Sequence, residues 1–396
     1  MIRSNENANS SVLWRRESIV IQRHRFVNRP GQLALLIGLQ SLGLLTLGWS
    51  QDPTPKVEST EYYRQAAQRL GPASKVVWTE PGENSLDRWN PRVQIEVQGV
   101  VVSWDTDKLI LVKPDGNGPT NFPGDLVIGI DPQWKSPAYA QVHQKYLQHQ
   151  YREVLQQGQT ALSLTEIPRW QQRLLVGEMV EAAVSIQQYA TAGRVFKVIA
   201  QDSPPDLLMS RIPLPWADEI GSVTPGLIQE SLSWMESENP ILQLLGAAWL
   251  AGTQHRLTAI EKLKSLGSNS SSRVSEYAKV QLWRTTPPEE ILSQKIQQWI
   301  DLRDRLSIPL QAGPTALLAY RLEQTNNPNL AIAEWLRVAS LHSDRYHLVE
   351  LANRRSLDLA KKSNDATLLQ SVSSSLKQLK LKGQDSSVQD ASLKGN

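Results

Sequence analysis

The chain has 396 residues, enough for two or three domains with hydrophobic cores, and its 40% hydrophobic and 20% charged residues are typical of a globular protein. Residues 1–50 carry six arginines against two glutamates, which leaves 36 basic and 37 acidic residues for the rest of the chain. A near-neutral body without a basic stripe argues against nucleic acid as the main partner. The absence of cysteine excludes disulfides, thiol nucleophiles and cysteine-ligated zinc sites.

The N-terminal segment has the layout of an export signal. Residues 33–49 form an apolar run that is broken only by Gln40 and Ser41, and all six arginines precede it. This charge pattern predicts that the N-terminus stays inside and that the body lies outside the membrane. Gly48 and Ser50 suit a cut after Ser50, so residues 1–50 are interpreted as a signal peptide. An uncleaved N-terminal anchor and a buried core helix are the alternatives.

We therefore expect an exported protein of the periplasm or cell envelope. It would touch the membrane only through the apolar segment 33–49, which would hold it at the inner membrane if the segment is not cleaved.

Residues 51–135 lead into the rest of the chain. Residues 51–91 are expected to be a linker with a short helix over 60–70, which Gly71 and Pro72 end. Residues 92–135 alternate in hydropathy and contain regular turn signals, which predicts three or four strands in a small antiparallel β domain, either SH3-like or a short sheet. The turn at 115–118 lacks the acidic ladder and distal glutamate of an EF-hand loop, so it is interpreted as a turn rather than a calcium site.

From Ser136 the apolar residues follow a helical period. Ser, Thr and Asn caps, prolines at first helical positions and glycine or proline stops delimit the helices. The predicted helices span 137–149, 150–166, 169–187, 188–203, 225–236, 240–252, 259–266, 272–284, 314–324, 329–341 and 346–361. A further helix is expected to begin at Pro287 and to carry Ile291, Ile296 and Trp299. Residues 362–396 are expected to be a flexible tail with at most a transient helix over 365–381.

A spacing pattern recurs in three of these helices. Ala192 is followed by Phe196 and Ile199, and Pro204 ends the segment. The preceding hairpin has Val154 and Gly158 at the matching places, 38 residues earlier. The helix over 329–341 repeats the spacing with the residues Ala331, Trp335 and Val338. A small residue lets two helices approach and an aromatic residue fills the groove between hairpins, so we interpret these residues as packing devices.

The pattern resembles the tetratricopeptide (TPR) repeat family, whose second helix carries a small residue, an aromatic residue and a terminal proline. The offset here is 38 rather than 34 residues, and the first helices lack the family's Trp, Leu-Gly and Tyr set. The middle helices, with Ala247, Ala248 and Ala278, are closer to HEAT-type pairs. The resemblance implies a mainly α fold, an α-solenoid of helical hairpins over 136–361, TPR-like with a HEAT-like middle, preceded by the small β domain.

Such a solenoid would present a concave face to a protein or peptide partner. Polar positions on the inner helices are expected to line that face: Glu178, Glu181, Arg321 and Glu323. The thirteen tryptophans are interpreted first as core residues, because most of them lie in apolar-periodic segments.

No catalytic or metal-binding pattern stands out. The six histidines show no metal-ligand spacing and are interpreted as solvated helix residues, and the carboxylates near Arg303 and Arg305 as a solvated face. Phosphate loops, dinucleotide fingerprints and nucleophile elbows are not found. We therefore predict no enzyme activity, no catalytic residue, no cofactor and no metal. The alternatives are an enzyme acting on wall polymers near Trp104, Asp105 and Trp134, or a structural spacer.

Overall fold

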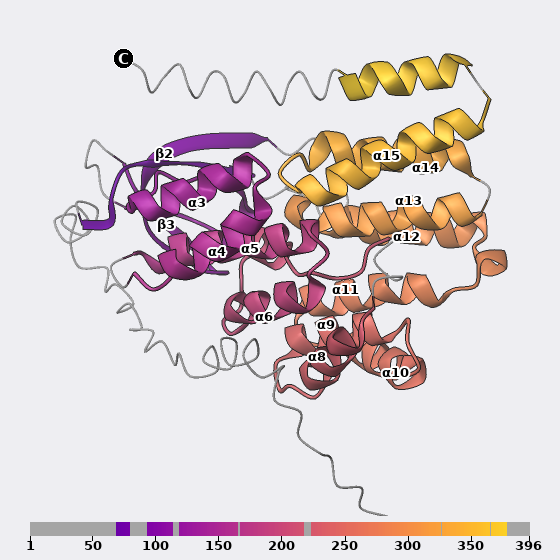
Figure 1. The fold of residues 1–396 in the computed structure, drawn as a ribbon, viewed down its shortest axis with the longest axis horizontal. Helices are drawn as coiled ribbons and strands as arrows, with labels where there is room; N and C mark the ends of the chain where they lie inside the picture. The colour runs from indigo at the N-terminus through magenta and orange to yellow at the C-terminus, as the bar shows by residue number, and fades with distance from the viewer. Residues whose placement is uncertain are drawn as a thin grey trace, which may run out of the picture. The chain divides into compact units, whose positions relative to one another are not determined.

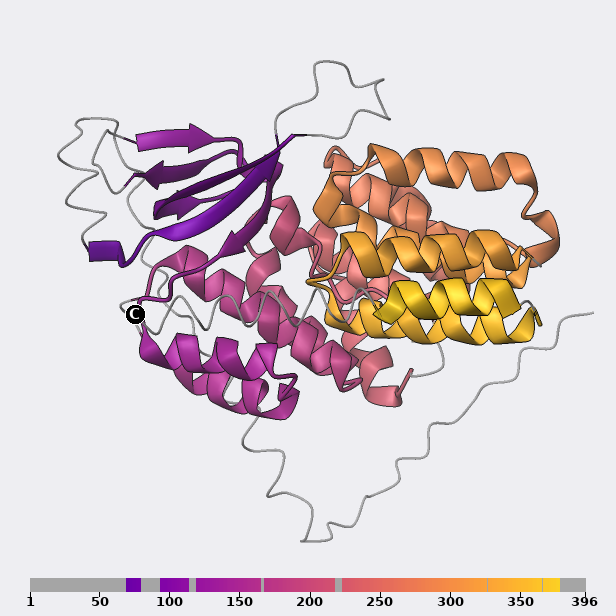
Figure 2. The ribbon, with the colours of Figure 1, turned by 90° about the horizontal axis from the view of Figure 1, so that it is seen from above.

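The computed structural model describes residues 69–79, 93–113, 119–164, 167–217, 223–325, 327–364 and 366–377. The expected signal segment, most of the linker, the turn at 115–118 and the tail beyond residue 377 lie outside the described residues. Figures 1 and 2 show an antiparallel sheet beside a series of paired helices.

The sheet contains five antiparallel strands in the order β4-β3-β2-β1-β5. They are β1 (Ser74–Thr79), β2 (Gln94–Trp104), β3 (Leu109–Val112), β4 (Pro119–Phe122) and β5 (Val127–Asp131), with a 3₁₀ turn η2 (Gly124–Leu126) before β5. The expected antiparallel sheet is confirmed. Strand β1 was not expected, because it lies within the stretch 51–91 that was assigned to a linker. It pairs with both β2 and β5, so the sheet begins about twenty residues earlier than predicted.

The first four helices form two successive hairpins: α3 (Pro137–Leu147), α4 (Tyr151–Ala161), α5 (Arg169–Ser185) and α6 (Tyr189–Ala200). Their connecting turns have the same backbone geometry. His149 and Gln187 have φ angles of 58° and 60°. The residue that follows each of them donates to a carbonyl five residues back, Gln150 to Lys145 and Gln188 to Ala183. This is a Schellman ending with a left-handed residue. The two turns are 38 residues apart, as are Val154 and Ala192, so the hairpin itself is repeated.

The middle of the chain contains the short α7 (Asp206–Met209) and four longer helices. These are α8 (Pro225–Met235), α9 (Pro240–Leu250), α10 (Arg256–Leu266) and α11 (Ser272–Leu282). Local signals start two of them as expected: Thr224 accepts a hydrogen bond from the Leu227 amide, and Asn239 from the Ile241 amide. Helices α8 and α9 approach closely because Gly246 has no Cβ, which would otherwise lie 2.3 Å from the Ser231 carbonyl oxygen.

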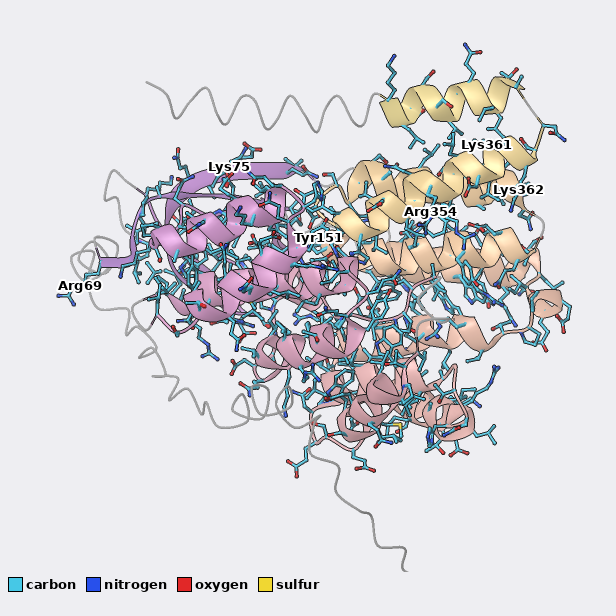
Figure 3. The ribbon with its side chains drawn as sticks, in the orientation of Figure 1. Arg69, Lys75, Tyr151, Arg354, Lys361 and Lys362 are labelled. Atoms are coloured by element: carbon cyan, nitrogen blue, oxygen red, sulfur yellow. The ribbon has the colours of Figure 1, made fainter. Side chains whose placement is uncertain are left out.

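The last part begins with two 3₁₀ turns, η4 (Trp283–Thr285) and η5 (Pro288–Glu290). Helix α12 (Ser293–Arg305), η6 (Ile308–Gln311), α13 (Ala312–Gln324), α14 (Pro328–Leu341) and α15 (Tyr346–Lys362) follow. The helix that was expected to begin at Pro287 is wrong in its first turn, because η5 ends before Ile291 and α12 starts only at Ser293. Lys361 and Lys362 close α15, where positive charge suits the helix dipole (Figure 3).

The short helix that the sequence suggests over 365–381 is present in the C-terminal segment. Residues 366–377 form a helix, and its Val372 is buried against Ile332 and Ala360. The apolar face of this helix therefore covers α14 and α15, and the helical part of the chain continues beyond α15.

One hydrophobic core joins the sheet to the helices. It contains Val76 of β1, Trp104 of β2, Phe196 of α6 and Ala352 of α15. Eight of the ten described tryptophans are buried, which confirms their role as core residues. Ala192, Phe196, Ala331, Trp335 and Val338 are fully buried as well, in agreement with their interpretation as packing devices.

The helices also make a long-range contact that repeat stacking does not require. In an open solenoid each repeat contacts only its neighbours. Here α5 packs against α15, and the rings of Tyr146 and Tyr346 lie 5.3 Å apart. Figure 3 shows Tyr151 where the first helices meet α15. The N-terminal hairpins and the C-terminal helices are thus joined directly.

Candidate functional site: a cavity between the sheet and the helices

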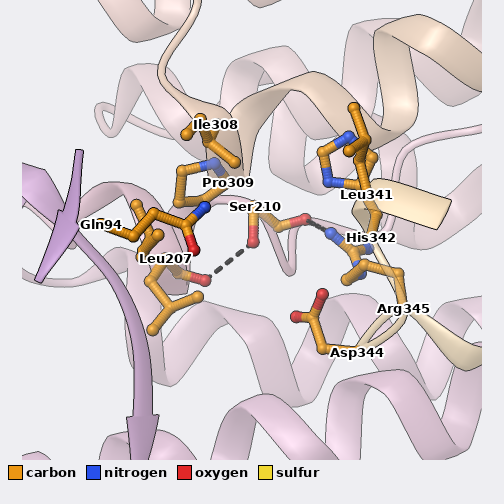
Figure 4. A pocket seen from close by; sticks show the side chains of 10 residues that line it. Gln94, Leu207, Ser210, Ile308, Pro309, Leu341, His342, Asp344 and Arg345 are labelled. Atoms are coloured by element: carbon orange, nitrogen blue, oxygen red, sulfur yellow. Dashed lines mark hydrogen bonds between the residues drawn. The ribbon is translucent and has the colours of Figure 1, made fainter. Parts of the chain in front are cut away.

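A cavity of about 190 Å³ lies where β2, β5, α7, η6 and the corner between α14 and α15 meet (Figure 4). Its apolar walls are Ile128, Leu207, Ile308, Pro309 and Leu341. Its polar lining is Gln94, Ser210, His342, Asp344 and Arg345. The elements that contribute these residues are far apart in sequence, so only the tertiary fold creates the site.

The corner at 342–345 supplies most of the polar groups. Helix α14 ends at Leu341, and the Arg345 amide donates to the His342 carbonyl at 2.9 Å before α15 begins. The buried Arg345 side chain then donates from Nη1 to the Ser210 carbonyl and pairs through Nε with Glu181. Arg345 therefore fixes α7 and α5 to the corner and keeps this wall of the cavity in place. Figure 4 shows its hydrogen bond to Ser210.

Glu181 is the centre of the ion network behind this wall. Its carboxylate pairs with Arg345, lies 3.3 Å from Nη1 of Arg211, and accepts a 2.6 Å hydrogen bond from Nδ1 of His347. Burial alone would raise the pKa of Glu181, but Arg345, His347 and Arg211 outweigh it and hold the pKa well below its usual value. Glu181 is therefore a buried, fully ionised carboxylate.

Arg211 extends this network to the cavity. It also pairs with Asp344 at 2.9 Å and donates to the Asp344 carbonyl at 3.3 Å. Although burial acts in the opposite direction, Asp344, Tyr146 and Glu181 raise the pKa of Arg211. The charges beside the cavity thus pair with one another.

A second pair lies one helical turn away on α5. His143 Nδ1 and Glu178 Oε1 are 2.6 Å apart, and Trp134 covers the imidazole at a ring distance of 5.5 Å. Two neighbouring glutamates of α5 thus each hold a histidine from another helix. The pairs tie α3 and α15 to the same face of α5.

His342 lies in the wall of the cavity with a buried imidazole. It is 3% exposed, and its Nε2 makes no hydrogen bond to any residue in the part of the chain that the structure describes. Burial lowers the pKa of His342 to about 4, with Arg345, Arg337 and Arg303 acting in the same direction against Asp344. At neutral pH the wall of the cavity therefore contains a neutral imidazole.

The prediction of an open binding face is wrong for Glu181 and Arg321, which are buried, whereas Glu178 and Glu323 are half-buried and engaged by other side chains. Glu181 is 1% and Arg321 6% exposed. Arg321 donates to the Thr286 carbonyl, and Glu323 accepts from Trp335 Nε1 at 2.6 Å. Glu178 is engaged by His143. Charged residues on a helix resemble surface residues in sequence, and only their distant partners show that they are buried.

The interpretation of the histidines as solvated is also wrong for His342, His347 and His143, which are buried or ion-paired. The expectation of a solvated charged face around Arg303 is wrong as well. Arg303 is 1% exposed and pairs with Asp304 and Glu334. The cavity residues His342, Asp344 and Arg345 were missed because a short polar run between two apolar helices is typical of an exposed turn.

Trp104, Asp105 and Trp134 do not come together as a catalytic site. Trp104 is buried, and its Nε1 donates to the Gly124 carbonyl at 3.3 Å. Asp105 accepts from the amides of Asp107 and Lys108 at 2.9 Å and so closes the turn between β2 and β3. Trp134 packs in another cluster, with Tyr139. Within the described ranges no three His, Asp or Glu side chains are grouped so as to hold a metal ion.

Comparisons with protein-family models, with curated proteins and with solved structures find no match to this chain. Of the helices in the described residues, none has the length and apolarity required to span a bilayer. The class that the fold defines is a mainly helical protein with a five-stranded antiparallel sheet at its N-terminal side.

Proposed function

We propose that the chain is a protein-binding scaffold and that the cavity receives one side chain of a protein or peptide partner. Its size carries the proposal. Pockets for drug-sized ligands and cofactors have volumes of about 300–1,000 Å³. The cavity, at about 190 Å³, is below that range and suits a single anchoring side chain. Anchors that fill such pockets contribute most of the binding energy of protein interfaces.

The rim of the cavity supports the same function. Leu341 lines it and is 57% exposed, although it is a large apolar side chain. Beneath it, Arg345 and Glu181 hold the wall with buried ion pairs. An exposed apolar rim over a fixed polar wall is an arrangement that favours binding with little reorganisation.

The repeated hairpins add a scaffold to this site. Stacked TPR-like or HEAT-like hairpins would provide an extended face for the remainder of the partner. The export signal predicted for residues 1–50 would place this interaction in the periplasm or cell envelope. The arginines before the apolar run 33–49 support this location.

Selection from a random peptide library on the full-length chain tests the function. We expect enriched peptides that share an anchor residue and that bind the Leu341→Asp variant at least about tenfold more weakly, because a charge on the rim opposes burial of an apolar group. Leu330→Asp is the matched control, because Leu330 lies on the same helix, is 52% exposed and does not line the cavity. It should retain binding.

Two results would contradict the proposal. One is the absence of any enriched peptide, which favours a structural spacer. The other is equal loss of binding in both variants, which would show that α14 responds to charge in general and that the cavity has no special role.

Export is tested separately by the intact mass of the protein recovered from expressing cells. A measured mass equal to that of residues 51–396 supports cleavage after Ser50. The full-length mass in a membrane fraction supports an anchor, and the full-length mass in the cytosol contradicts export.

A further inference from the structure

The C-terminal helix, residues 366–377, lies on an apolar strip of α14 and α15 that is separate from the main core. Figure 1 shows this helix in yellow beyond α15. The strip consists of four side chains, namely Ile332, Leu336, Leu359 and Ala360. Other side chains anchor α14 and α15 in the main core, among them Trp335, Val338, Leu348 and Ala352. The packing of α14 and α15 in that core therefore does not require the C-terminal helix.

The contact between the C-terminal helix and the strip is shallow. Among residues 366–377 only Val372 is buried, while Leu368, Leu369 and Leu376 are half-buried. Four of the other residues are serines, which form helices less readily than alanine or leucine. A helix of about twelve residues is marginal in water without tertiary contacts. The C-terminal helix therefore depends on the strip, whereas the strip is built by the main core.

The connection to α15 allows the helix to leave the strip. Helix α15 ends at Lys362, so only residues 363–365 join the two helices. Ser363 and Asn364 are exposed, and Asn364 has a left-handed φ of 54°. A left-handed conformation is disfavoured for a residue with a Cβ, so a change of the backbone at Asn364 relieves strain and uncovers only the strip.

The spacing in the C-terminal helix indicates what the strip accepts. Leu368, Val372 and Leu376 recur every four residues and so share one face of the helix. Insertion of such a face into an apolar groove is a common mode of peptide recognition. We infer that the strip is a docking site for an amphipathic helix of a partner protein with apolar side chains at this spacing, and that helix 366–377 occupies the site as an autoinhibitory strap. None of these residues lines the cavity, so the strip would act independently of the proposed anchor site.

A synthetic peptide of residues 364–380 is the probe, because the structure shows that its helix fits the strip. Fluorescence anisotropy measures its binding to the full-length chain and to the full-length Val372→Asp variant. In the variant the tethered helix should leave the strip, since a charge cannot be buried there without a partner. We expect saturable binding to the variant, at least about tenfold tighter than to the wild-type chain, where the tethered helix competes at an effective concentration in the millimolar range.

Two altered peptides are the controls. The peptide with Val372→Asp should not bind the variant chain. The peptide with Ser374→Asp should bind like the unaltered one, because Ser374 is exposed and lies two residues from Val372, on the opposite side of the helix.

The absence of binding to the variant, or equal affinity of the variant and the wild-type chain, would overturn the inference. Dimerisation of the variant in size-exclusion chromatography with light scattering would do so as well, because the strip would then pair with a second copy. Hydrogen exchange of the wild-type chain gives a result even if Val372→Asp does not fold. The amides of residues 366–377 should exchange at least about tenfold faster than those of α14, and equal protection would contradict a strap that opens separately from the core.

Discussion

Glu181 places a carboxylate inside α5, at a position where an apolar residue would avoid the cost of desolvation. Removing charges from water costs several kcal/mol per ion, and good geometry with additional hydrogen bonds is needed to offset it. The contacts of Glu181 with Arg345, Arg211 and His347 provide this geometry. At the scale of the residue, this group holds the helix hairpins at the beginning of the chain to the corner that forms the cavity.

The substitution Glu181→Gln should lower the free energy of unfolding by about 3–5 kcal/mol, because it leaves the buried Arg345 without its counter-charge. Urea denaturation followed by far-UV circular dichroism measures the change. Glu230→Gln is the matched control: it breaks the ion pair with Arg194, in which Glu230 is 31% exposed, and should change stability by less than about 1 kcal/mol. Equal effects of the two variants would show that Glu181 contributes no more than a surface charge.

His342 should make stability depend on pH between about 6.5 and 4. The folded chain keeps the imidazole neutral because its pKa is lowered to about 4, whereas the unfolded chain protonates it below its ordinary value of 6.5. The unfolded state therefore binds more protons in this window, and stability falls as the pH falls, by up to about 1.4 kcal/mol per pH unit and about 3 kcal/mol in total.

The difference between the wild-type chain and His342→Gln in urea denaturation at several pH values isolates this effect. The slope should be shallower in the variant between pH 6.5 and 4.5. The pKa of Glu181 is held below its ordinary value of 4.5, so its contribution to stability is lost only at lower pH and does not overlap this window. Parallel slopes would show that His342 titrates normally in the folded chain.

At the scale of the element, the hairpin turn is the repeated feature. His149 and Gln187 occupy the left-handed position that glycine prefers, because a Cβ is disfavoured there. The hairpin of α13 and α14 shows the same donor pattern, with the Asn327 amide bonded to the Leu322 carbonyl five residues back. In both hairpins the small residue follows the bonded amide by four positions, Ala192 after Gln188 and Ala331 after Asn327.

Gln187→Gly should therefore stabilise the chain by up to about 1 kcal/mol, since it removes left-handed strain from an exposed residue. Lys197 is also exposed but lies inside α6, so Lys197→Gly should destabilise by about 1 kcal/mol through chain entropy. Thermal and urea unfolding of both variants provide the comparison. A stabilising effect of Lys197→Gly, or a loss of stability with Gln187→Gly, would contradict the interpretation of the turn.

Local signals made most of the helices predictable. Thr224 with Pro225 and Asn239 with Pro240 act within one turn, so the sequence contains their full cause. Strand β1 was not predictable in this way, because its six residues become a strand only by pairing with β2 and β5. The cavity was not predictable for the same reason, because it too depends on contacts between distant parts of the chain. Its buried Arg345 is held by the Ser210 carbonyl, which lies 135 positions away in the chain.

At the scale of the whole molecule, the sheet and the helices are expected to unfold as one unit. They share a single core from Val76 to Ala352. Trp170 of α5 donates a buried hydrogen bond of 3.1 Å to the Val101 carbonyl of β2. The cavity also takes residues from both parts, including Gln94 and Arg345. A core that is continuous across two parts couples their stabilities, because neither part can open without exposing apolar surface of the other.

Deletion of residues 69–131 should therefore abolish cooperative unfolding of the helices. The deletion exposes the apolar surface around Trp170 and leaves its indole N–H without the Val101 carbonyl. Thermal unfolding followed by circular dichroism at 222 nm should show a broad transition and raised binding of a hydrophobic dye, whereas the full-length chain should unfold in one sharp transition. A sharp transition within a few degrees of that of the full-length chain would instead identify the sheet as an independent domain, and the cavity would then lie at a domain interface rather than within a common core.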